Sequence, residues 1–218
     1  MPRRPRKDTP DNELLHGQWR ARLRRYRFTR NIKQAALAAD LGVTQAMVSR
    51  WESGVVDPSP GMQQRIMDLL RTDTVGAPLI DWRTHAGEQP GLAAVINRSG
   101  LIETASQGLA RLLGRGRSEI EGEHVQDVFT GDLPRLFGLL LSAGFFDEAV
   151  ESVESADRYC FVDRNGQVAG CCVQGLHWPH RGEDGEIRWM LSGARIDEAD
   201  FEELRRAMPG QFDLVTAR

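Results

Sequence analysis

The residues best suited to covalent or metal chemistry lie in the last third of the chain. They are three cysteines followed by two histidines, namely Cys160, Cys171, Cys172, His177 and His180. A thiolate beside an imidazole can act as a nucleophile, and both side chains bind zinc. However, three cysteines are one short of an all-cysteine site, and no cysteine–histidine pair has the spacing of a known nucleophile–base motif. Adjacent Cys171 and Cys172 would also point to opposite faces of a strand, so we expect structural thiols, no metal site and no enzyme.

A second chemical signal is the distribution of charge. Residues 1–72 hold 14 Lys and Arg against 7 Asp and Glu, whereas residues 73–218 hold 14 against 24. The resulting balances of +7 and −10 account for the net charge of −3 of the whole chain. A basic segment of this kind favours contact with a polyanion, and the acidic remainder indicates a different function.

Length and composition limit the class of protein. The chain has 218 residues and a mass of 24.4 kDa, with 40% hydrophobic and 27% charged residues, a balance typical of globular domains. No apolar run approaches the roughly 18 residues of a membrane helix, and the N-terminus lacks the apolar region of a signal peptide. We expect a soluble, cytoplasmic protein with reduced cysteines and no membrane partner.

Breaks in composition divide the chain into two domains with flanking segments. Three prolines among basic residues indicate a mobile N-terminal arm, and glycines and prolines after residue 72 indicate a linker. The predicted segments are a basic flexible arm over 1–12, an all-α bundle of four to five helices over 13–72, a linker over 73–90, an α+β domain with a five-stranded antiparallel sheet over 91–197, and a C-terminal helix and tail over 198–218.

Two short helices joined by a tight turn are predicted within the all-α bundle. The first spans residues 32–41 and ends at Gly42, which can adopt the left-handed conformation of a helix C-cap. Thr44 can cap the second helix, residues 45–53, through its hydroxyl. Two helices arranged in this way form a helix-turn-helix.

One stretch of the bundle has the pattern of a known family. The string from Gln34 to Gly54, QAALAADLGVTQAMVSRWESG, resembles the helix-turn-helix of the phage-repressor and Cro superfamily, also called the XRE family. The resemblance covers residues 18–70 and rests on a glutamine that opens the first helix, a glycine in the turn, and Ser-Arg-Trp-Glu-x-Gly at the end of the second. It implies a DNA-binding domain whose second helix lies in the major groove.

The same resemblance implies roles for individual residues. The base-contacting residues would be Gln45, Ala46, Ser49 and Arg50. The phosphate-contacting residues would be Gln34, Lys33, Thr44 and Arg30, and a structural salt bridge would join Arg27 and Glu52. Glutamine can pair with adenine, arginine can pair with guanine, and an alanine methyl group can touch the methyl group of thymine.

The second domain has a recognisable order of elements. Two strands, several helices and three further strands are predicted in that order, with the short segments Val95–Ile102, Leu112–Gly114, Ser118–Gly122 and Ser192–Glu198. This order and these segments resemble a PAS domain. The resemblance covers residues 91–196 and implies a sensing or dimerising module without naming a ligand. No cofactor is required, and a small PAS ligand stays open, including haem held by His124.

These features predict a sequence-specific transcription regulator that binds double-stranded DNA as a homodimer through the PAS-like domain. An alternative is a protein-interaction module, antitoxin-like or regulator-binding, that uses the same helices without recognising DNA. The arginines of the first helix have an alternative interpretation of their own, as an ordinary solvated helix face that contacts no DNA.

Overall fold

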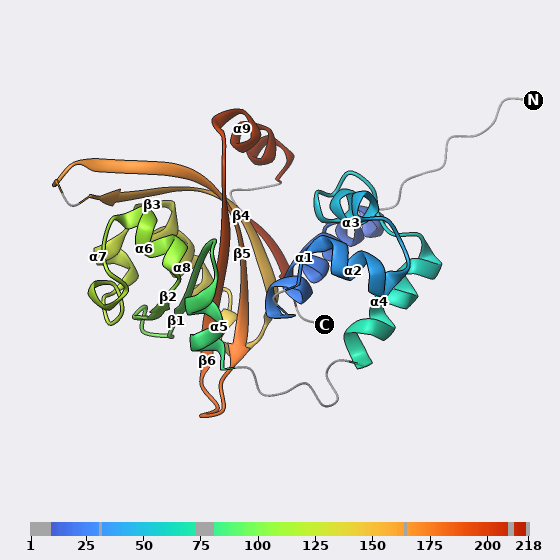
Figure 1. The fold of residues 1–218 in the computed structure, drawn as a ribbon, viewed down its shortest axis with the longest axis horizontal. Coiled ribbons are helices and arrows are strands. Elements are labelled where there is room, and N and C mark those ends of the chain that lie inside the picture. Colours follow the sequence, from blue (N-terminus) through green and yellow to red (C-terminus); the bar gives the residue numbers. More distant parts are fainter. Residues whose placement is uncertain (1–9, 31, 73–80, 164, 209–211, 217–218) are drawn as a thin grey trace, which may run out of the picture. The chain divides into compact units, whose positions relative to one another are not determined.

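The computed structural model describes residues 10–30, 32–72, 81–163, 165–208 and 212–216 (Figure 1). The chain forms two units, Met1–Pro78 and Leu79–Arg218, each with its own hydrophobic core. Most of the predicted arm and residues 73–80 of the predicted linker lie outside the described residues. Within the described residues, no helix is long and apolar enough to cross a membrane.

The first unit is helical throughout its described residues. Its helices are α1 (Pro10–Arg30), α2 (Gln34–Leu41), α3 (Gln45–Glu52) and α4 (Pro60–Thr72). These four helices agree with the prediction of an all-α bundle of four to five. The helix α1 begins at Pro10, so residues 10–12, which we predicted as part of the flexible arm, are helical.

The turn between α2 and α3 is held by two local caps. Gly42 adopts φ 65°, in the left-handed region, and its N–H donates to the Ala39 carbonyl at 3.1 Å. The Val43 N–H donates to the Ala38 carbonyl at 2.9 Å, which satisfies a second free carbonyl at the end of α2. The Thr44 hydroxyl then accepts the Met47 N–H at 3.3 Å and caps α3. These bonds fix the direction in which α3 leaves the turn.

A single apolar core joins the four helices of the first unit. The buried side chains come from every helix and are Trp19, Leu23, Leu37, Ala38, Leu41, Val48, Trp51 and Ile66. In α3, Val48 is fully buried and Trp51 is 5% exposed. Because these two positions face inward, the opposite side of α3 must face outward.

The second unit is an α+β domain. Its helices are α5 (Trp82–Glu88), α6 (Gln107–Leu113), α7 (Val125–Val128), α8 (Asp132–Ser142) and α9 (Glu198–Ala207), with short 3-10 turns at Arg117–Glu119 and Phe145–Asp147. Its strands are β1 (Leu92–Ile96), β2 (Ile102–Ala105), β3 (Thr130–Gly131), β4 (Val150–Val162), β5 (Val168–Arg181), β6 (Ile187–Ile196) and β7 (Phe212–Thr216). This agrees with the predicted fold class.

The strands form one antiparallel sheet with the order β2-β1-β6-β5-β4-β3, and β7 pairs with β4. Figure 1 shows α6, α7 and α8 over one face of this sheet, and the main core, with Phe137 and Trp189 stacked 6.1 Å apart, lies between these layers. On the other face, Phe201 of α9 packs on Ala156 and Cys172. The helix α5 packs against β1 and β2.

The structure corrects three details of the prediction. Among the described residues the sheet has seven strands, whereas five were predicted. The two strands missing from the prediction are β3, which is only two residues long, and β7. The strand β7 lies in the segment predicted as a C-terminal tail and pairs with β4, for example Leu214 with Val153. In the segment predicted as a linker, residues 82–88 form α5, which Asp81 caps by accepting the Arg83 N–H.

Candidate nucleic-acid interface

The outward side of α3 carries the four side chains predicted to contact bases. Gln45, Ala46, Ser49 and Arg50 are all exposed, whereas Val48 lies in the core. Their spacing places them on one face of α3, from its first residue, Gln45, to Arg50 in its last turn. This face presents hydrogen-bond donors and acceptors together with one methyl group and one positive charge.

The N-terminus of α2 offers further hydrogen-bond donors. Lys33 is exposed at the N-cap position and makes no side-chain cap hydrogen bond. The N–H groups in the first turn of a helix, together with the helix dipole, favour an anion at this end. Gln34 follows directly and is half-buried.

A three-residue polar network joins α1, α2 and α3 behind these surfaces. Arg27 donates to Glu52 twice, from Nε to Oε1 at 2.5 Å and from Nη2 to Oε2 at 2.7 Å. Gln34 Nε2 donates to Glu52 Oε2 at 2.9 Å. The Glu52 side chain is 5% exposed, so its charge is matched by Arg27 within the domain.

Arginines along α1 add further positive charge. Arg30, predicted to contact phosphate, is half-buried and lies over the Tyr26 ring at 5.7 Å. Arg22 donates to Met67 Sδ at 3.3 Å and lies over the Trp19 ring at 5.8 Å. These arginines therefore also pack against the domain, so a purely solvated face does not describe them.

The second unit contains a buried hydrogen-bonded chain that the sequence did not reveal. Trp189 Nε1 donates to His177 Nδ1 at 3.1 Å, and His177 Nε2 lies 2.8 Å from Ser155 Oγ, which donates to Asp157. Because indole can only donate, Nδ1 is an acceptor and the neutral ring carries its proton on Nε2. His177 is therefore held within the core as a neutral hydrogen-bonding residue and not as a catalytic base.

The acidic end of this chain is fully buried. Burial raises the pKa of Asp157 to about 7, against the opposing effect of the Ser155 hydrogen bond. Among the described residues, Asp157 Oδ1 and the Tyr159 hydroxyl have no hydrogen-bond partner. Burial also raises the pKa of Tyr159 well above its usual value, so its hydroxyl stays neutral.

Cys171, Cys172 and His124 have structural surroundings. Burial raises the pKa of the Cys171 and Cys172 thiols, and Cys172 donates to Glu198 at 3.2 Å, so both favour the unreactive protonated form. His124 accepts the Gln126 N–H at 3.2 Å and thereby caps α7. No group of His, Cys, Asp or Glu side chains in the described part of the chain could hold a metal ion.

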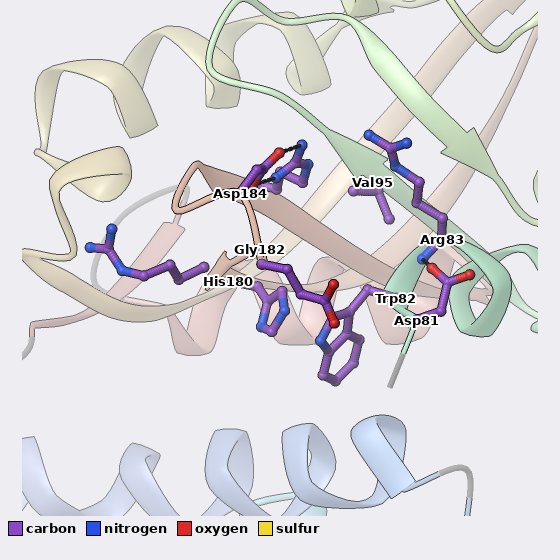
Figure 2. A pocket seen from close by; sticks show the side chains of 10 residues that line it. Asp81, Trp82, Arg83, Val95, His180, Gly182 and Asp184 are labelled. Atoms are coloured by element: carbon purple, nitrogen blue, oxygen red, sulfur yellow. Dashed lines mark hydrogen bonds and ion pairs between the residues drawn. The ribbon is translucent and has the colours of Figure 1, made fainter. Parts of the chain in front are cut away.

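A surface pocket of the second unit, between the start of α5 and the β5–β6 hairpin, is shown in Figure 2. The Trp82 and His180 rings lie against each other, with centroids 4.4 Å apart. Arg188 is paired with Asp184 at 2.7 Å and with Glu103 at 2.6 Å. Because acidic neighbours already engage this arginine, the pocket is a poorer site for a polyanion than the first unit.

Comparison with known proteins identifies the first unit. Residues 19–78 match the model of a family described as helix-turn-helix domain. The first unit contains a helix-turn-helix domain. Its matched region includes α2, the turn and α3, and thus every residue predicted to contact DNA. No curated protein matches the sequence of the chain.

Several solved PAS domains are similar in structure. One, from an HTR-like protein of Haloarcula marismortui, is 19% identical, with 53% of this chain and 94% of that chain covered and a TM-score of 0.41. Another, from nitrogen regulation protein NR(II) of Vibrio parahaemolyticus, is 11% identical, with 54% and 99% covered and a TM-score of 0.41. A third, from a Colwellia psychrerythraea protein, is 15% identical, with 59% and 98% covered and a TM-score of 0.41. The order of strands and helices in the second unit is the PAS-like order predicted from the sequence.

The helix-turn-helix domain brings most of the predicted residues onto two neighbouring elements. The four base-contacting candidates lie on α3, while Thr44, Lys33 and Gln34 lie in the turn or at the start of α2. Arg30 is the last residue of α1, three residues before Lys33. Their contacts with DNA stay predictions. Sequence reasoning missed the Gln34–Glu52 hydrogen bond, because it joins residues 18 positions apart and leaves no local pattern.

Proposed function

We propose that this chain is a transcription regulator that binds specific duplex DNA through α3 and forms a homodimer through its PAS-like unit. The observation that carries the proposal is the exposed polar face of α3, opposite Val48 and Trp51. Gln45 and Arg50 have the hydrogen-bonding groups that read adenine and guanine in the major groove.

Electrostatic attraction supports the same proposal. The basic balance of residues 1–72 supplies positive charge where a polyanion would bind, whereas the remainder of the chain is acidic. Binding to a duplex selected from a random pool should therefore weaken as salt increases. The slope of log affinity against log salt should be about −0.9 per neutralised phosphate. A flat salt response would refute binding to the DNA backbone.

Arg50 offers a sharper test because it is exposed and lies on the base-reading face. Arg50→Ala should cost about 1–3 kcal/mol on the selected duplex and relax the preference at one base pair. Arg65→Ala is a matched control, because Arg65 is an exposed arginine on α4 of the same domain. Equal losses for the two variants on all duplexes would mean that Arg50 contributes only general charge.

A dimer would give the DNA site a defined symmetry. Two copies of α3 in successive major grooves lie about 34–36 Å apart, so half-sites should be about 10 base pairs apart, centre to centre. Light scattering should give twice the mass of 24.4 kDa for the full chain. The selected DNA should contain an inverted repeat; a single half-site would contradict the dimer.

The PAS-like unit is proposed to dimerise, with sensing of a small molecule as a second role. An absorption spectrum and native mass spectrometry of the purified protein would identify a retained ligand, including haem. If random duplexes are not bound at all while a protein partner is retained, the same helices form a protein-interaction module instead.

A further inference from the structure

The outward side of α8 leaves large apolar side chains in solvent. The side of the helix that faces the core buries Leu133, Leu136, Phe137 and Leu140. On the opposite side, Leu139 and Leu141 stay 46% and 43% exposed. Helical spacing places these two leucines on either flank of Gly138, which is itself exposed. The outward side of α8 is therefore apolar where a solvent-facing helix normally carries polar residues.

Among the described residues, no packing contact requires a glycine at position 138. A Cβ atom at this position would meet no other atom within 4 Å. The residue lies inside α8 and does not have a positive φ, so its backbone conformation does not require glycine either. Glycine destabilises the interior of a helix relative to alanine. A costly glycine that the fold does not need indicates a close approach of another backbone from outside.

The two ends of α8 differ in charge. Near the N-terminal end, the Arg135 side chain is 72% exposed, and its ion pair with Asp132 is long, at 3.7 Å. Asp132 is already paired with Arg205 at 3.0 Å, so Arg135 can still donate to a further acceptor. At the C-terminal end, the last carbonyl groups of the helix carry a partial negative charge. Asp147 follows this end and stays 61% exposed although it is paired with Arg98.

A second copy of α8 in antiparallel orientation matches this pattern. The N-terminal end of each helix would lie beside the C-terminal end of the other, so that each Arg135 meets a negative end. The two backbones could approach at Gly138, and the exposed leucines would then cover the flanks of the opposite helix. A two-fold dimer requires a surface that is complementary to itself in this way. A second copy uses both charged ends at once, whereas a partner of a single charge would use only one.

We propose that the chain forms its homodimer through α8, with the outward sides of two copies packed antiparallel around Gly138. The inference rests on the proposed function, which includes a homodimer of the PAS-like unit, and it assigns the interface. It also gives a role to Leu139 and Leu141, which the core of this unit does not include.

Gly138→Gln should affect the fold and the dimer in opposite directions. Glutamine favours a helix more than glycine does, and the space at position 138 is open. At concentrations where the chain is monomeric, the variant should therefore unfold at a higher temperature than the wild type. The longer side chain should hold the two helices apart and expose the leucines between them. The dissociation constant of the dimer should rise by about tenfold or more.

Sedimentation equilibrium of the full chain measures this dissociation constant. Gly61→Gln is a matched control, because Gly61 is an exposed glycine of α4 whose Cβ position is equally open. Leu139→Ala should raise the dissociation constant by about thirtyfold, because each dimer loses two leucines whose exposed halves it would bury. Arg135→Gln should raise it by about fivefold at low salt and by less at high salt. The control should leave it unchanged.

Three results would overturn the inference. If the wild type is a dimer that Gly138→Gln and Leu139→Ala leave intact, another surface forms the dimer and the proposed homodimer stands. If Gly61→Gln weakens the dimer as much as Gly138→Gln does, the effect is not specific to α8. A wild-type chain that stays monomeric at every concentration would contradict the proposed homodimer as well. If Gly138→Gln does not fold, Leu139→Ala and Arg135→Gln decide the inference by the same measurement.

Discussion

Asp157→Asn should change how the stability of the second unit depends on pH. Burial raises the pKa of Asp157 in the folded state from an ordinary 3.8 to about 7. Between these values the folded state keeps the proton that the unfolded chain has released, so the free energy of unfolding falls as the pH rises. The contribution of this proton is complete below about pH 4 and is lost as the pH approaches 7.

The size of the effect follows from the same shift. Each pH unit well inside the window changes the free energy of unfolding by about 1.4 kcal/mol, but at pH 7 the folded state has released only half of this proton, so the change between pH 5 and pH 7 is about 2 kcal/mol. Asparagine has no proton to lose. As the pH rises from 5 to 7, the variant should therefore gain stability relative to the wild type by this amount. Above the pKa of Asp157, the difference between the two proteins should no longer change.

Urea unfolding of the full chain at pH 5, 6, 7 and 8 measures this difference directly. Asp127→Asn is a suitable control, because Asp127 is an exposed aspartate of the same unit. The stability difference between Asp157→Asn and the wild type should widen with pH, whereas that of the control should not. A difference that stays constant from pH 5 to pH 8 would refute proton binding by Asp157.

Two further substitutions test how the elements are held. Thr44→Ala removes the hydroxyl that accepts the Met47 N–H. It should lower the free energy of unfolding of the first unit by about 1 kcal/mol, measured by chemical denaturation. An unchanged free energy of unfolding would show that this cap is unimportant. Phe201→Ala removes a side chain that is 2% exposed and lies beneath the Arg158 and Arg205 guanidinium groups, 4.5 and 5.1 Å from its ring centre. This substitution should lower the free energy of unfolding of the second unit by about 3 kcal/mol. Amide hydrogen exchange should become faster in α9 and stay unchanged in the first unit. Exchange in α9 at the wild-type rate would contradict its docking through Phe201.

The helix-turn-helix could be predicted because its determinants are local. The N–H groups of Gly42 and Val43 end α2 by donating to carbonyls three and five residues earlier in the chain, respectively, and Thr44 caps α3 three residues ahead. Each of these interactions depends on residue types within one helical turn. The order of elements in the second unit was also readable, since alternating apolar residues and glycine turns mark its long strands.

Two strands at one edge of the sheet, β3 and β7, were missed because they form only by pairing with β4, which is distant from them in the sequence. The strand β3 has two residues, too few to show any periodicity, and pairs with Tyr159 and Cys160 of β4. The strand β7 pairs with β4 across roughly sixty residues, as in Ser155 with Phe212. A run of five residues after a helix is equally compatible with a tail, so only the neighbouring strand decides its conformation.

The buried chain of the second unit shows where a weaker signal was available. Antiparallel pairing places Ser155 opposite Gly175, next to His177, which the sequence separates from Ser155 by 22 positions. A Cβ atom on Gly175 would lie 2.4 Å from Ser155 Oγ and 2.5 Å from His177 Nε2, so any larger residue would displace this hydrogen bond. A glycine inside a strand often marks such a close approach. Gly175 therefore pointed to a crowded site in β5, but Ser155, which crowds it from β4, could be named only after the register of the sheet was known.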